Sequence, residues 1–260
     1  MSMKFPTLDI SGLFFLTIVM FLPAFLQSQE LRNVDLKQSE NTLIVHNDHK
    51  AVGEINHANM SDEIAGSFID ERDGQEYKWV MIGDQIWMGE NLNYGVYISK
   101  YESPSENESA EKYCYKNNLE NCTKYGGLYQ WFELMDYSVV EGDRGLCPQG
   151  WHVPSSKDWE DLLNTIGRSN SAEKLKSVSG WSKKQPGSNE YGFNALAGGM
   201  VHSRTLNHFE DLGKHAYFWS SSNFEITTSW SWIIYGDKNE IVRINEGNKN
   251  SFSARCVKDW

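Results

Sequence analysis

The chain has 260 residues, a formal net charge of −11 and 13% aromatic residues. This length allows one large domain, or one domain with an extension. The acidic balance argues against nucleic acid or an anionic membrane surface as a partner, because affinity for both comes from Lys and Arg side chains.

The N-terminus predicts a secretory signal peptide over residues 1–28. A charged leader precedes an apolar run at 12–26, Pro23 interrupts this run, and the small Ser28 offers a cleavage position. A helix that spans a bilayer needs about 18 or more apolar residues, so the shorter run favours a signal peptide. Asp9 is unusual in such a leader, and an uncleaved anchor is the alternative. We expect no membrane insertion after cleavage.

Residues 29–67 predict a polar linker or stalk. The segment is rich in asparagine and poor in aromatic residues, and its one short apolar patch is Leu43-Ile44-Val45. A segment with so little apolar surface does not fold alone. The folded domain is therefore expected to span residues 68–260, with order beginning near Phe68.

Two adjacent hairpins are predicted at the start of this domain. Asp73-Gly74 is a hairpin-type turn signal, and residues 77–82 are rich in amino acids that favour strands. Gly83-Asp84 then turns the chain into a second strand at 85–88. Residues 99–112 contain many Ser, Glu and Asn, which predicts an exposed loop.

Two helices are predicted from apolar residues spaced three and four apart. The first is expected to end near Asp136, and its apolar stripe consists of Leu128, Trp131, Phe132 and Met135. The second helix begins with Ser155 and Asp158, which have the spacing of a capping box, and ends at Gly167. The stripe of the second helix consists of Trp159, Leu162, Leu163 and Ile166.

The second half of the domain combines a long loop region with strands. Residues 169–215 show little periodicity and many Gly, Asn and Ser, which predicts an irregular region. Strand-forming residues return at 217–222, 229–235 and 240–244, and 252–257 predicts a last strand. The domain is therefore expected to be α+β, with two helices, antiparallel strands and a long irregular loop region.

Four cysteines in a secreted chain predict two disulfides, for which three pairings are possible. Cys114 and Cys122 are close in sequence and are separated by a polar turn, which favours a local bridge. That leaves Cys147 with Cys256, closing a loop of about 110 residues. Zinc is the alternative, but no two cysteines have Cys-x-x-Cys spacing.

Short motifs occur in a fixed order along the expected domain: Asp73–Tyr77, Ile82–Tyr94, Tyr125–Trp131, Cys147–Trp159, Leu175–Ser177, Gly180-Trp181, Gly192–Leu196, Phe218–Ser221 and Ala254–Asp259. With these motifs, residues 70–259 resemble the Fibrobacter succinogenes major paralogous domain family. The order of the elements resembles the C-type lectin-like fold, in which both chain ends meet in one sheet. The resemblance implies a secreted or surface-exposed bacterial protein of a family found mostly in Bacteroidetes and Fibrobacteres, for which no general activity is established. Fold-level similarity does not by itself assign a function.

A calcium-dependent sugar site of the lectin type would need a Glu-Pro-Asn or Gln-Pro-Asp loop and a later Trp-Asn-Asp, because calcium requires oxygen ligands. Here Gln185-Pro186-Gly187 has glycine in place of a ligand, and Trp232 is followed by Ile233-Ile234. We therefore expect no such calcium site. No other metal or cofactor is predicted.

No catalytic residue is predicted either. A serine nucleophile at Ser220-Ser221-Ser222, near His215, would need a positioned base and an oriented third group, and the sequence indicates neither. These serines are expected to form hydrogen bonds to loops. His202 and His208 could meet across a loop, but the histidines have no metal-ligand spacing such as His-x-x-x-His.

Aromatic residues are the remaining indication of function, since the chain contains 10 Trp, 12 Tyr and 12 Phe. Such side chains either fill the core or stack on ligands such as sugar rings. Five tryptophans lie in predicted elements or family motifs and are expected in the core: Trp87, Trp131, Trp151, Trp159 and Trp219. Trp230 and Trp232 share one strand face, which is more often buried. The candidates for ligand contact are Trp181, Gln185 and Tyr191.

We therefore predict a non-catalytic binding or structural module at the cell surface. It would recognise a glycan or a surface protein through the loops at 169–215. The alternative is an enzyme of unknown class that uses polar loop residues such as His202 and His215.

Overall fold

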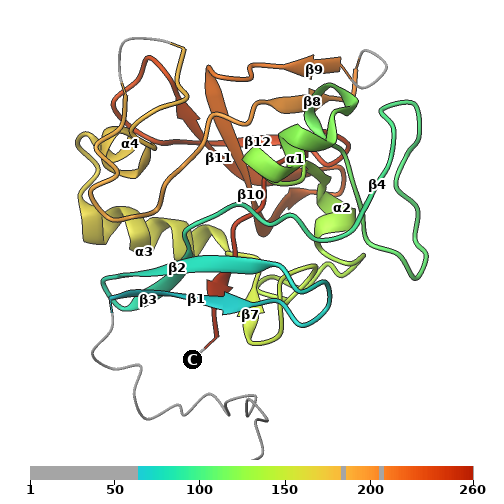
Figure 1. The fold of residues 1–260 in the computed structure, drawn as a ribbon, viewed down its shortest axis with the longest axis horizontal. Helices are drawn as coiled ribbons and strands as arrows, with labels where there is room; N and C mark the ends of the chain where they lie inside the picture. The colour runs from blue at the N-terminus through green and yellow to red at the C-terminus, as the bar shows by residue number, and fades with distance from the viewer. Residues whose placement is uncertain (1–63, 183–185, 205–207, 260) are drawn as a thin grey trace, which may run out of the picture. The chain divides into compact units, whose positions relative to one another are not determined.

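The computed structural model describes residues 64–182, 186–204 and 208–259 (Figure 1). All of them belong to one compact unit, Ile55–Trp260. The predicted signal peptide, most of the predicted linker, and Gln185 lie outside the described residues. No helix in the described ranges is long and apolar enough to cross a membrane.

The first sheet joins the two ends of the domain. Its strands, in spatial order, are β1 (Ala65–Ile69), β2 (Glu76–Ile82), β3 (Gln85–Met88), β14 (Val257–Lys258) and β7 (Trp151–His152). Both predicted hairpins are present, and Gly74 and Gly83 at their turns have positive φ. β1 already begins at Ala65, so the folded domain starts before the predicted boundary at Phe68. Its Ala-Gly-Ser residues carry little strand signal, and the strand is formed through pairing with β2.

Three smaller sheets complete the strands. One has the order β10 (His215–Glu225), β11 (Thr228–Tyr235) and β12 (Val242–Gly247). A second has the order β6 (Tyr129–Gln130), β13 (Ser251–Phe252), β8 (Met200–His202) and β9 (His208–Glu210). The third pairs β4 (Val96–Tyr97) with β5 (Glu111–Lys112) in parallel.

The last predicted strand, 252–257, is divided between two sheets. β13 pairs with β6 and β8, whereas β14 pairs with β3 and β7. Arg255 lies between the two strands, and its buried guanidinium binds main-chain oxygens of other segments. The chain therefore crosses from one sheet to the other at this residue.

The structure has more helices than the sequence predicts. The described ones are η2 (Tyr115–Asn117), α1 (Leu119–Tyr125), α2 (Trp131–Leu134), α3 (Ser156–Ile166) and α4 (Ser171–Leu175). The predicted helix ending near Asp136 is reduced to α2, because the main chain of Leu128 pairs with Tyr113 and residues 129–130 form β6. The region 169–215 is also less irregular than predicted, since it contains α4, β8 and β9.

Helix α3 confirms the second predicted helix and its cap. The Ser155 hydroxyl accepts from the Asp158 amide at 3.2 Å, and the Asp158 carboxylate accepts from the Ser155 amide at 2.8 Å. A cap of this kind contributes about 1 kcal/mol. α3 contacts β2 of the first sheet and also β10 and β11, and Figure 1 shows it between these two sheets.

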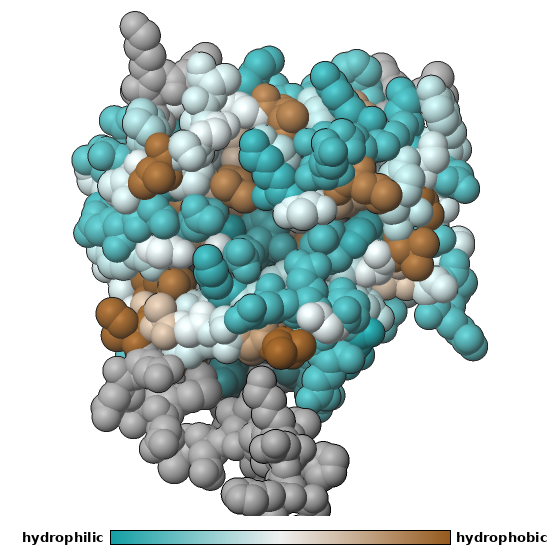
Figure 2. Space-filling view, in the orientation of Figure 1, coloured by the Kyte–Doolittle hydropathy of each residue, from teal (hydrophilic) through white to brown (hydrophobic). Residues whose placement is uncertain are grey.

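The core is rich in aromatic side chains. Trp159 of α3 lies at its centre, 4.9 Å from Trp87 and 5.8 Å from Trp232 between ring centroids. All five tryptophans that the sequence places in the core are buried. On the face drawn in Figure 2, apolar side chains form small separate patches among polar ones.

Both predicted disulfides are present. Cys114 and Cys122 are 5.0 Å apart between Cα atoms, and Cys147 and Cys256 are 5.9 Å apart. The second bridge links the segment before β7 to the residue before β14. Loop entropy assigns roughly 2.5 kcal/mol to the short bridge and about 5 kcal/mol to the long one.

Candidate ligand-binding pocket

A surface pocket of about 650 Å³ lies between β9, the turn that follows it, and η2. We call it the β9–η2 pocket. It is lined by Tyr115, Lys116, His208, Phe209, Glu210, Asp211, Leu212 and Lys214. Most of these residues belong to the predicted recognition loops at 169–215.

Two aromatic rings form the apolar part of the pocket. The centroids of Tyr115 and Phe209 are 5.1 Å apart and the rings are tilted by 53°. Tyr115 is almost fully buried and packs with Leu128 and Val201, while Phe209 is partly exposed. Burial raises the pKa of the Tyr115 phenol. The ring is therefore a fixed, neutral surface.

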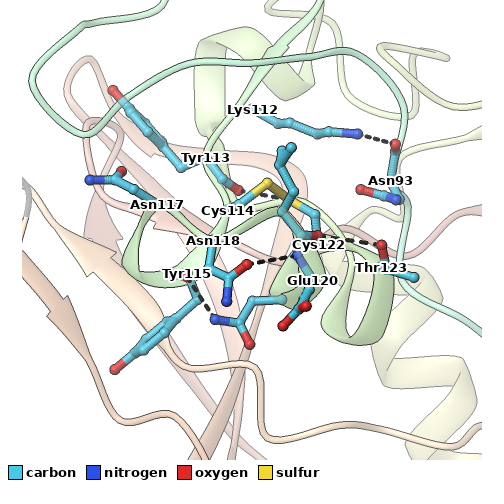
Figure 3. Close-up of a disulfide and its surroundings, with 12 residues drawn as sticks. Asn93, Lys112, Tyr113, Cys114, Tyr115, Asn117, Asn118, Glu120, Cys122 and Thr123 are labelled. Carbon is cyan, nitrogen blue, oxygen red and sulfur yellow. Dashed lines mark hydrogen bonds between the residues drawn. A yellow bond between two sulfur atoms is a disulfide. The ribbon is translucent and has the colours of Figure 1, made fainter.

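The backbone of η2 is held in an unusual conformation beside the short disulfide. Lys116 and Asn117 have φ of +56° and +55°, a region that side chains with a Cβ rarely adopt. The Asn121 side chain donates to the Tyr115 carbonyl at 2.8 Å, and the Asn118 side chain caps α1. Figure 3 shows this arrangement, with the Tyr115 ring directed away from the disulfide. Such local strain is often found at functional sites.

The opposite wall of the pocket is the turn after β9, and Asp211 in this turn has a φ of +63°. Its carboxylate accepts from the Tyr217 hydroxyl at 2.8 Å and lies 3.6 Å from the Lys214 ammonium. Burial, together with this hydrogen bond to Asp211, raises the pKa of Tyr217. Gly199 packs against the main chain of this wall, and a Cβ at this position would come within 2.3 Å of the Glu210 carbonyl oxygen. Only glycine allows this close approach.

The rim of the pocket carries charges of both signs. His208 lies 3.4 Å from Glu210, and both side chains are exposed. Lys116 is also exposed and forms no ion pair with a described residue. The rim can therefore donate and accept hydrogen bonds at the mouth of an aromatic pocket.

Two of the three ligand-contact residues predicted from the sequence, Trp181 and Tyr191, lie outside this pocket, and the third, Gln185, is outside the described residues. Trp181 and Tyr191 are partly buried and pack against the core cluster around Trp159. The indole nitrogen of Trp181 donates to Ser177, and the Lys176 ammonium lies 5.0 Å from its ring centroid. Neither aromatic lines the β9–η2 pocket.

The histidines are brought together only in part. His202 and His208 are directly paired across β8 and β9, an arrangement that the sequence allowed but did not favour over solvated or core positions. His215 lies apart from them, with its Nδ1 3.3 Å from the Gly236 amide and its ring against Tyr235. In the described part of the chain, no group of three His, Cys, Asp or Glu side chains is arranged to hold a metal ion.

The three adjacent serines have structural partners, as predicted. Ser220 donates to the Trp230 carbonyl at 2.8 Å, and Ser222 donates to the Glu141 carboxylate at 2.5 Å. The Ser221 hydroxyl accepts from the Gly142 amide. These bonds fasten β10 to β11 and to the loop around 141–142.

Comparison with known proteins assigns the domain. The sequence matches the family described as Fibrobacter succinogenes major domain over residues 80–258. The chain belongs to this family. The Fibrobacter succinogenes major domain here includes the β9–η2 pocket and both disulfides, and its description names no activity. No curated protein and no solved structure matches the chain.

Proposed function

We propose that this domain is a secreted, non-catalytic glycan-binding module of the C-type lectin-like fold, and that the β9–η2 pocket receives one sugar unit. The two disulfides support an extracellular location, because such bridges persist in oxidising compartments. The sheet in which β14 pairs with β3 and β7 supports the fold, because it brings both ends of the domain together.

The observation that carries the proposal is the pairing of an aromatic surface with a polar rim. A sugar ring has an apolar face of C–H groups and a periphery of hydroxyls. The partly exposed Phe209, supported by the buried Tyr115 ring, offers the surface for that face, and Lys116, Glu210 and Lys214 offer donors and acceptors for the hydroxyls. The volume also falls in the range of about 300–1,000 Å³ that small-molecule sites occupy.

An enzymatic role has less support from the geometry. General base catalysis needs a side chain held in a fixed orientation near its substrate. Both side chains of the His208–Glu210 pair are exposed to solvent, so neither is held in a fixed orientation. His202 and His215 make no ion pair with a described carboxylate. An enzyme is therefore the alternative function, and release of product in the binding experiment would identify it.

The test is a glycan-array screen of the full chain, with and without calcium, followed by calorimetry with the best glycan. Lys116→Ala removes an exposed rim donor and should weaken binding at least about tenfold, with the fold unchanged. Phe209→Ala should weaken it further. Tyr101→Ala, which removes an exposed aromatic outside the pocket, is the matched control and should change nothing.

Binding that is unaffected by both pocket variants would place the ligand elsewhere and contradict the proposal. Absence of binding to every glycan would also contradict it. Release of shortened glycan during the titration would favour the enzyme alternative. Loss of binding on chelation would show a calcium dependence that the sequence does not predict.

A further inference from the structure

Helix α3 covers only part of one face of the β10-β11-β12 sheet. Trp232 of β11 points to this face and is buried against Trp159, with ring centroids 5.8 Å apart. Trp230 precedes it by two positions on the same strand, so its side chain lies on the same face. Trp230, however, is only partly buried. The part of this sheet face around Trp230 is therefore not covered by α3.

A local irregularity of β10 adds a second aromatic ring to this open face. The pairing of β10 with β11 shifts register on both sides of Asn223. Such bulges twist a strand and redirect its side chains. Phe224 follows directly, is 45% exposed, and lies edge-on to Trp230 with ring centroids 4.7 Å apart. Two adjacent rings are thus left accessible to solvent.

Polar side chains flank the two rings. The Arg243 guanidinium lies 4.4 Å from the centre of the Trp230 ring and 3.8 Å from the Glu160 carboxylate. Asn245 is directly paired with Trp230 in the strand register and is exposed. The side chains of Arg243 and Glu160 are 41% and 31% exposed, so their mutual contact is weak and can yield to a ligand.

We propose that Phe224, Trp230, Arg243, Glu160 and Asn245 form a second sugar-binding surface, the β11 platform, and that its ligand is a neutral oligosaccharide. Phe224 stacks on the C–H face of a pyranose unit beside Trp230, one face of which carries the Arg243 guanidinium, and the three polar side chains bind the hydroxyls. Glu160 pairs with Arg168 as well as with Arg243, so the surface holds donors and an acceptor side by side, which suits hydroxyls that both donate and accept. The platform stands independently of the β9–η2 pocket, because the two share no residue.

The two surfaces differ in the part of a glycan that they accept. The β9–η2 pocket is a surface depression with walls and suits a chain end or a single unit. The β11 platform is an exposed sheet face bounded on one side by α3, so a chain can continue past it on the side away from this helix. It therefore accepts units of an extended oligosaccharide, and hexaoses are suitable probes.

The test is an NMR titration of the full chain with cellohexaose, mannohexaose and xylohexaose. The signal is the indole N–H of Trp230, assigned from its absence in Trp230→Phe. At least one hexaose should shift this signal in a saturable manner. Phe224→Ala removes an exposed ring and should raise the dissociation constant at least about tenfold with the amide spectrum otherwise retained. Tyr101→Ala, a matched exposed aromatic, should leave it unchanged.

The outcomes separate this surface from the pocket. A Trp230 shift that persists in Lys116→Ala supports two independent sites. Loss of the shift in Lys116→Ala would show a single site at the pocket and overturn the platform. No shift with any of the three hexaoses, or a shift that titrates identically in Phe224→Ala, would also overturn it.

Discussion

Arg255 is a large polar residue in the interior of the domain. It is fully buried and forms no ion pair with a described carboxylate. Its guanidinium donates instead to the Asn91 side chain and to the carbonyls of Met88, Phe193 and Asn194. Burial lowers its pKa to about 9. Four acceptors from two separate segments, 88–91 and 193–194, thus converge on one planar donor.

Replacing this donor should be costly even when the charge is kept. Arg255→Lys retains a cation but loses the planar fork, which leaves buried carbonyls without donors. We expect the free energy of unfolding to fall by about 2–4 kcal/mol. Urea denaturation of the full chain measures this loss. Arg168→Lys, at an exposed site, is the matched control and should change stability by less than about 0.5 kcal/mol. Equal effects of the two variants would refute the role of Arg255.

Three elements meet at His152. This residue of β7 lies 2.7 Å from Asp259, just after β14, and 3.5 Å from Asp158 in the first turn of α3. Burial alone would lower the pKa of His152, but the bonds to Asp158 and Asp259 outweigh it and raise the pKa. The pKa of Asp158 is lowered to about 2: burial opposes the shift, and bonds to His152 and Ser155 drive it.

This contact should make stability depend on pH. Because the pKa of His152 is higher in the folded than in the unfolded protein, protonation of this histidine stabilises the fold. The stabilisation is complete below the unfolded-state pKa of about 6.5 and is lost as the pH rises through the folded-state pKa. We therefore expect His152→Gln to cost more at pH 5.5 than at pH 8.5, with a difference of roughly 0.5–1 kcal/mol because the pair is partly exposed. Urea denaturation at both pH values is the measurement. A larger cost at pH 8.5 would reverse the sign and disprove the assignment.

Elements with local signals were predictable, and elements that depend on distant partners were not. α3 follows from its capping box, and the two N-terminal hairpins follow from Asp73-Gly74 and Gly83-Asp84. The shortening of α2 follows from the main-chain pairing of Leu128 with Tyr113, which no helical spacing reveals. The division of the last predicted strand depends likewise on the remote acceptors of Arg255.

The candidate site shows the same contrast. The sequence placed recognition in the 169–215 loops, and residues 208–214 of the pocket lie there. It missed Tyr115 and Lys116, because their position depends on the positive φ of η2 and on contact with Phe209. The turn at Asp211-Leu212-Gly213 was the one local hint of this wall. Trp181 was predicted to contact a ligand because it lies in a loop region, whereas in the structure it packs against the core.

At the scale of the whole molecule, the two disulfides have different consequences. The Cys147–Cys256 bridge spans 109 residues and ties the segment before β7, in the middle of the domain, to its C-terminal strand, whereas Cys114–Cys122 spans 8 residues beside the pocket. In both cases removal of the pair avoids a free thiol, so the double alanine variants are compared.

We expect removal of Cys147 and Cys256 to lower the free energy of unfolding by about 5 kcal/mol, and removal of Cys114 and Cys122 by roughly 2.5 kcal/mol. Glycan affinity at the β9–η2 pocket should follow the opposite order, because the short bridge holds η2. Urea denaturation and calorimetry of both variants provide the comparison. If the long-range pair affected affinity more than the short one, the short bridge would have no special role in shaping the pocket.

The position of β14 also bears on how the domain folds. This strand comes last in the domain's sequence yet sits inside the first sheet, between β3 and β7. Until it arrives, the edge of β3 lacks its neighbour, and pairings of such long sequence separation form slowly. Exposed strand edges favour intermolecular association. The nascent chain therefore passes through an aggregation-prone stage that ends only when residues 257–258 insert, which makes chaperone protection most valuable before that moment.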